Sequence, residues 1–232
     1  MKWEEFEITP SRNNFTYNGI KLFKEDFSEV LEFQSPGIAA VKTENDWFHI
    51  QSDGSLLYAK VYERVFGFYF NRAVVKEKGF YYHIGLDGLA VYEERFLWCG
   101  NFQEKVCVVK DFKNKYFHID LNGNNLYGEK YLYSGDFKEG IACVCAEDGY
   151  YTHIDKKGNL LHNRFFQLLD VYHKGFARAK DKEGWFHIDR RGNPIYNSKF
   201  YLIEPFYNGL AFCITLEGKQ AVVDEMGNVR LL

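Results

Sequence analysis

The chain has 232 residues, with 29 basic and 32 acidic side chains and a formal charge of −3. This near balance lacks the positive field with which proteins attract nucleic acid, so we expect no nucleic-acid partner. No run approaches the roughly 18 apolar residues of a membrane-spanning helix, and the acidic segment 1–8 lacks the apolar core of a secretion signal. We therefore predict a cytoplasmic monomer without a membrane partner.

A short apolar run that ends in a turn glycine recurs at intervals of 34 or 35 residues. The six copies are Trp47–Gly54, Tyr81–Gly88, Tyr116–Gly123, Tyr151–Gly158, Trp185–Gly192 and Gln220–Gly227. A fixed period of this length is the signature of repeated supersecondary units. One period earlier lies a degenerate first unit, 1–36, and later units start near 37, 71, 105, 140, 175 and 209. We predict one β-repeat domain over 1–232, with about seven units of about 35 residues.

Each unit resolves into four short pieces. The first, such as Gly140–Cys145, is apolar at both alternating positions, which predicts a strand covered on both faces. The second, such as Trp185–Asp189, alternates like a strand and runs into a tight turn with dipeptides such as Asp87-Gly88. The third is a short strand ending in an aromatic residue, and the fourth is another aromatic strand. No helical period of ten or more residues appears, so we predict an all-β protein.

The two ends of the chain indicate how the repeats are arranged. The last copy stops at Leu232, after its third piece, and leaves a strand position open. The segment Trp3–Ile8 has the length and apolar residues to fill it. Such a pairing of the ends predicts a closed β-propeller with small blades. The alternative is an open β-solenoid of hairpins.

The pattern G-x-A-x-V followed by [W/Y]-F-H-I-D-x-x-G resembles the WG repeat, or KWG repeat, of bacterial proteins. In that family a Trp-Gly-Tyr-Ile-Asp run precedes a turn glycine. The chain departs from the family at two positions, because a histidine replaces the family's aromatic residue and other residues replace its glycine. These other residues are Phe48, Tyr82, Phe117, Thr152 and Phe186. The resemblance covers nearly the whole chain and implies a divergent branch, a β-rich bacterial scaffold with no common activity.

One histidine occupies the same position in five copies, and three of these copies carry an aspartate two residues later. The residues are His49, His83, His118, His153 and His187, with Asp120, Asp155 and Asp189. Equivalent positions around a ring do not converge within the roughly 2 Å of a metal–ligand bond, and two copies carry Asn14 and Val222 instead. We interpret the set as a structural network in which each buried histidine ties its hairpin to the next unit and the aspartate fixes its tautomer. We predict no metal and no cofactor.

The cysteines and the missing catalytic motifs argue against an enzyme. The five cysteines are an odd number, and Cys143 and Cys145 form the only close pair, without a second pair at zinc-ligand spacing. We interpret them as reduced structural thiols. The sequence contains no G-x-S-x-G, H-E-x-x-H, P-loop or G-x-G-x-x-G motif, so we expect no catalytic residues.

Five residues break the repeat consensus and are therefore our candidate binding residues, since packing alone does not demand them. They are Trp98, His162, His173, Arg72 and Arg178. A repeated framework with little chemistry favours a noncatalytic scaffold for protein–protein interaction, with a protein partner as its ligand. The alternative is a propeller that binds a glycan or a small ligand.

Overall fold

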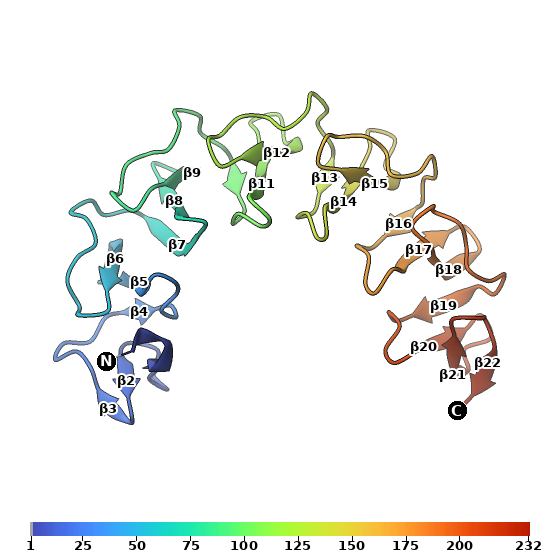
Figure 1. Cartoon of the computed structure of the whole chain (residues 1–232), viewed down its shortest axis with the longest axis horizontal. Helices are drawn as coiled ribbons and strands as arrows, with labels where there is room; N and C mark the ends of the chain where they lie inside the picture. The colour runs from blue at the N-terminus through green and yellow to red at the C-terminus, as the bar shows by residue number, and fades with distance from the viewer. Residues whose placement is uncertain (1) are drawn as a thin grey trace. The chain divides into compact units, whose positions relative to one another are not determined.

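The computed structural model describes residues 2–232, which fold into short antiparallel strands (Figure 1). In this range the helical structure is one 3₁₀ turn, η1 (Trp3–Glu5), and no helix is long and apolar enough to cross a membrane. The prediction of an all-β repeat protein is confirmed. The strands belong to two compact units: one extends to Asn114 and includes 118–125, and the other comprises 115–117 and 126–232.

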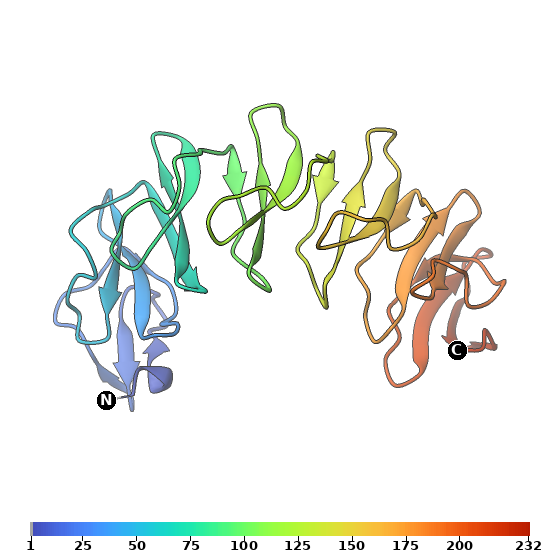
Figure 2. The same ribbon diagram turned by 45° about the horizontal axis from the view of Figure 1, so that its top comes forward.

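Small meander sheets follow one another along the first part of the chain (Figures 1 and 2). The first contains β1 (Glu7–Ile8), β2 (Phe15–Tyr17) and β3 (Ile20–Lys21), and the second β4 (Glu29–Val30), β5 (Ile38–Lys42) and β6 (Trp47–Gln51). The third contains β7 (Arg64–Tyr69), β8 (Arg72–Glu77) and β9 (Phe80–Ile84), and the fourth β10 (Trp98–Cys99), β11 (Val106–Lys110) and β12 (Tyr116–Asp120).

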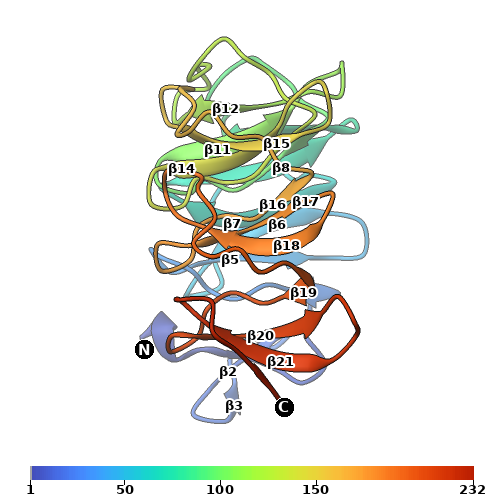
Figure 3. The ribbon, with the colours of Figure 1, turned by 90° about the vertical axis from the view of Figure 1, so that its right-hand side faces the viewer.

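Two further sheets lie in the C-terminal unit. One contains β13 (Tyr133–Ser134), β14 (Ile141–Cys145) and β15 (Tyr151–Asp155). The other runs in sequence order through β16 (Leu168–Leu169), β17 (Ala177–Asp181), β18 (Gly184–Ile188), β19 (Phe200–Ile203), β20 (Leu210–Thr215), β21 (Gln220–Asp224) and β22 (Val229–Leu231). Figure 3 shows β19, β20 and β21 side by side. The pair Trp185↔Phe200 joins the meander β16–β18 to the strands β19–β22. Earlier copies have a single bridge at the equivalent place, such as Tyr151↔Phe166.

The sheets after the first combine strands from consecutive repeats, whereas β1, β2 and β3 all belong to the first repeat. The first and second pieces of one copy pair along their full length, as in β14 and β15 from Ile141↔Asp155 to Cys145↔Tyr151. The outer strand is the fourth piece of the preceding copy, as in the pair Tyr133↔Cys145 of β13 and β14. A repeat therefore cannot unfold without removing a strand from the sheet of its neighbour.

The third piece differs from the prediction of a strand. It forms a strand only in the first and last copies among the described residues, as β3 and β22. In the copies between, it makes isolated bridges such as Ile154↔Leu160 and then leaves the sheet. The aromatic residue that follows packs on the next repeat, as described below.

The N-terminal segment forms a strand of the first copy, and its pairing with the last copy stays a prediction. Strand β1 pairs with β2 inside the first repeat, and Trp3, Phe6 and Ile8 pack on the core around Phe15. In the last copy, β22 itself pairs along the free side of β21. Both segments are thus already used within their own repeats. The closed ring and the single domain over 1–232 stay predictions.

Candidate functional site

The repeated histidines are buried, and His49, His83, His153 and His187 are each held by two hydrogen-bond partners. All five are at most 1% exposed. His187 lies with Nδ1 2.5 Å from the Tyr196 hydroxyl and Nε2 2.9 Å from the carbonyl oxygen of Glu204. A carbonyl only accepts, so Nε2 carries the hydrogen and Nδ1 accepts from the hydroxyl. The same two partners, 9 and 17 residues further on, hold His49 and His83.

These imidazoles are neutral because burial opposes their charge. It lowers the pKa of His49, His83, His153 and His187 from 6.5 to about 4. An aromatic ring two residues beyond the accepting carbonyl also packs on the imidazole, as Phe206 does on His187 with ring centroids 4.0 Å apart. The histidine thus connects its own hairpin to the strand that enters the next sheet.

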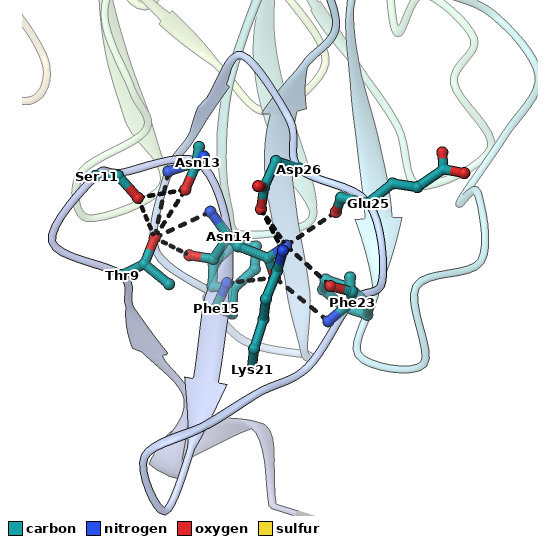
Figure 4. Close-up of polar contacts among 9 residues, drawn as sticks. All are labelled: Thr9, Ser11, Asn13, Asn14, Phe15, Lys21, Phe23, Glu25 and Asp26. Atoms are coloured by element: carbon teal, nitrogen blue, oxygen red, sulfur yellow. Dashed lines mark hydrogen bonds and ion pairs between the residues drawn. The ribbon is translucent and has the colours of Figure 1, made fainter.

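In the first repeat, Asn14 occupies the position that a histidine holds in later repeats. Asn14, fully buried, donates to the carbonyl of Glu25 and to the carboxylate of Asp26, and its Oδ1 accepts the N–H of Phe15 (Figure 4). The last copy has Val222 in this position. Within residues 2–232 no three metal-binding side chains cluster. The array is therefore a framework of hydrogen bonds whose ring nitrogens are already occupied.

The aromatic residue that binds each histidine also covers the turn glycine of the following repeat. A Cβ at Gly158 would lie 2.7 Å from Cγ of Tyr127, and Gly158 has a φ of +80°. Both the backbone conformation and the close approach of the ring therefore require glycine. The equivalent contacts are Gly54 with Phe23, Gly88 with Tyr58, Gly123 with Tyr92, Gly192 with His162 and Gly227 with Tyr196.

The aspartates have a role different from the predicted one. Asp189 Oδ1 accepts the N–H groups of Arg191 and Asn193, each at 2.9 Å, and so fixes its own turn. Asp120 and Asp155 make the same pair of bonds. The interpretation that the aspartates fix the histidine tautomer was wrong. In His153 and His187, Nδ1 is bonded to a histidine or tyrosine side chain and Nε2 to a backbone carbonyl, so neither ring nitrogen bonds an aspartate side chain.

Two of the five candidate binding residues belong to this framework. His162 replaces the tyrosine of its copy: its Nε2 lies 3.1 Å from Nδ1 of His153, and it is 7% exposed. Arg178 donates through Nε to the carboxylate of Asp170 at 2.5 Å and through Nη1 to the carbonyl of Ile203 at 2.9 Å. Both side chains therefore hold successive copies together.

The other three candidates lie nearer the surface. Arg72 is partly buried and donates to the carbonyl oxygens of Asn71 and Leu121. Trp98 is 41% exposed on β10, and His173 is partly exposed in the hairpin turn before β17. The five candidates do not form one site.

A hollow of about 380 Å³ in the C-terminal unit contains one candidate, His173, and the ion-pair partner of another, Arg178. It is lined by Tyr133, Gly135, Cys143, Leu169, Asp170, Val171, His173 and Pro205. His173 lines it directly, whereas Arg178 acts through its ion pair with Asp170. Sequence reasoning missed Tyr133, which stands one period after Trp98 and pairs with β14 as Trp98 pairs with β11.

The hollow contains a protonated thiol. Its thiol, Cys143, donates to the carbonyl of Leu169 at 3.2 Å, and burial raises the pKa of Cys143 to about 12. A thiol held protonated in this way is a poor nucleophile. Tyr133 and Val171 are 46% and 38% exposed, so the hollow offers apolar surface beside a charged pair and an imidazole.

Comparisons with known proteins support the fold. No family model matches the sequence, and no curated protein matches it. Among solved structures, the chain is similar to BamB from Moraxella catarrhalis, with TM-score 0.50, 9% identity and coverage of 99% of this chain and 85% of that one. It is equally similar, at TM-score 0.50 and 9% identity, to Kluyveromyces lactis Hsv2 with loop 6CD replaced by a Gly-Ser linker, covering 98% of this chain and 93% of that one. BamB is a β-propeller, so the chain has a propeller-like repeat fold.

Proposed function

We propose that the chain is a noncatalytic scaffold that binds a protein partner through the hollow in its C-terminal unit. The observation that carries the proposal is that the residues that hold the repeats together are different from the residues that are exposed in the hollow. The histidines, tyrosines and turn glycines are used in holding repeats together. The hollow instead presents exposed Tyr133 and Val171, and aromatic residues of this kind dominate the centres of protein interfaces.

A photo-crosslinker tests this proposal in the source cell. We expect benzoyl-phenylalanine at Val171 to trap one discrete partner, and Tyr133→Glu to abolish the product because it places a charge in the apolar contact. Leu216→Glu is the matched control, since Leu216 is 58% exposed and outside the hollow. A product that survives Tyr133→Glu, or no discrete product, would overturn the assignment.

The size of the hollow favours a second candidate, a glycan or small ligand, because small-molecule sites span about 300–1,000 Å³. A glycan array and a metal-content measurement distinguish this candidate from the first. The WG-repeat relationship, the monomeric state and the cytoplasmic location stay predictions.

A further inference from the structure

Strands β1 and β22 each have one free edge. β1 is the outer strand of its sheet and pairs only with β2, and β22 is the outer strand of its sheet and pairs only with β21. Within residues 2–232, no further strand or isolated bridge lies on the outer side of either strand. A free edge presents N–H and C=O groups that another strand can bind, and proteins usually cover such edges.

The hydrogen bonds of the last sheet show which groups of β22 point outward. Leu232 donates its N–H to the carbonyl of Gln220 on β21. Because bonded and non-bonded pairs alternate along an antiparallel ladder, the N–H and C=O groups of Val229 and Leu231 point away from β21. Their side chains are 43% and 55% exposed, so this edge is apolar as well as unpaired.

The same reasoning identifies the outward groups of β1. Ile8 lies opposite Phe15 of β2, and the carbonyl of Phe15 accepts the N–H of Leu22 on the other side of β2. Phe15 therefore bonds away from β1, so that Ile8 turns its own N–H and C=O toward the free edge. An antiparallel strand beside β1 can thus exchange two hydrogen bonds with Ile8.

Each free edge also carries one charged residue that has no partner. Glu7 on β1 and Arg230 on β22 are exposed, and among the described residues neither side chain makes an ion pair or a hydrogen bond. When Ile8 pairs with Val229, Glu7 stands opposite Arg230 in a non-hydrogen-bonded pair, where the side chains of two strands are closest. Opposite charges stabilise a cross-strand pair of this kind.

Charge disfavours the pairing of β22 with itself. If two β22 edges met in the register that uses both outward residues, Val229 would pair with Leu231 and Arg230 would lie opposite Arg230. Like charges that lie directly opposite each other destabilise a sheet. The β1 edge, with its glutamate, therefore fits β22 better than a second β22 edge does.

The interior of the chain already contains a junction of the same kind. Strand β19 pairs with β18, the second piece of its own repeat, and on its other side with β20, the first piece of the next repeat. β22 likewise pairs with β21, the second piece of the last repeat, and β1 takes the place of a first piece beside β2. Placing β1 against the free side of β22 continues the arrangement that joins consecutive repeats.

We propose that copies of this chain associate head to tail, with β22 of one copy pairing antiparallel with β1 of the next through Ile8↔Val229 and the ion pair of Glu7 with Arg230. A contact between two different surfaces of this kind builds a ring where the rotation closes and an open chain of copies where it does not. The proposal departs from the monomer predicted from the sequence. It does not depend on the hollow that we propose as the site of a protein partner.

Charge exchange tests the pairing by light scattering and sedimentation over a range of protein concentrations. We expect the parent to form species larger than one chain of 27.3 kDa. Glu7→Arg and Arg230→Glu should each weaken association by about tenfold, because each places like charges opposite one another. The double variant, and an equal mixture of the two single variants, should recover the association of the parent. Lys113→Glu, an exposed charge reversal outside both strands, is the control.

Cysteine cross-linking distinguishes pairing between chains from pairing within one chain. Oxidation of Glu7→Cys/Arg230→Cys should give a ladder of multiples of one chain on a non-reducing gel, whereas neither single variant can extend beyond a dimer, because the native cysteines are buried. A parent that keeps the mass of one chain, a double charge variant that does not recover, or a cross-link confined to one chain would contradict the proposal. Tyr133→Glu should leave the association unchanged, so failure here and failure of crosslinking at Val171 are separate outcomes.

Discussion

The neutral histidine array predicts that acid unfolds this protein at a pH well above that at which most carboxylates titrate. His49, His83, His153 and His187 have a pKa of about 4 in the folded chain, against 6.5 for a free imidazole. The unfolded chain therefore binds more protons between pH 6.5 and pH 4. The stabilisation is fully present above about pH 6.5 and is lost as the pH falls toward 4.

The size of the effect follows from proton linkage. Each histidine lowers the free energy of unfolding by up to about 1.4 kcal/mol for each pH unit in this window, and four give about 5 kcal/mol per unit. Between pH 7 and pH 5 the total is about 7 kcal/mol. Small domains are stable by about 5–15 kcal/mol, so the acid midpoint should lie near pH 5.

Urea unfolding from pH 7.5 to pH 5, followed by circular dichroism and tyrosine fluorescence, measures this slope where the two transitions coincide. We expect His187→Asn to be less stable at pH 7 and to lose about a quarter of the slope, since asparagine does not titrate. Lys113→Asn, an exposed substitution, is the control. A slope that His187→Asn leaves unchanged, or full stability at pH 4, would refute the reasoning.

Two further predictions concern contacts between and within repeats. Gly158→Ala should destabilise the chain by more than Gly149→Ala. Both glycines have positive φ, but a Cβ on Gly158 would meet the ring of Tyr127, whereas a Cβ on Gly149 would meet nothing within 4 Å. Equal urea midpoints for the two variants would contradict this. Asp189→Ala should lower the free energy of unfolding by about 1 kcal/mol, because its turn hydrogen bonds are lost. The double mutant with His187→Ala should lose the sum of the two single losses. A coupling energy above about 1 kcal/mol in this double-mutant cycle would instead indicate a direct interaction between the two side chains.

The sequence predicts the two paired strands of each repeat well because their signal is local. Alternation and a following Asp-Gly or Asn-Gly turn specify a hairpin such as β14 and β15 without reference to the rest of the chain. In the copies between the first and the last, the third piece makes an isolated bridge, and its aromatic residue packs on the next repeat's glycine. That contact lies between copies, so no pattern within one copy reveals it.

The candidate sites are harder to predict, because breaking the consensus has two different causes. His162 and Arg178 differ from other copies and yet fill framework positions, because His162 bonds the repeated His153 and Arg178 bonds Asp170. Tyr133 looks like an ordinary aromatic residue in an aromatic chain, and only its exposure separates it from the core. A repeat sequence therefore distinguishes binding residues from packing residues only when the exposure of the position is also known. In a scaffold whose copies share one framework, the positions to test for recognition are those at which a large apolar side chain stays exposed without a packing reason.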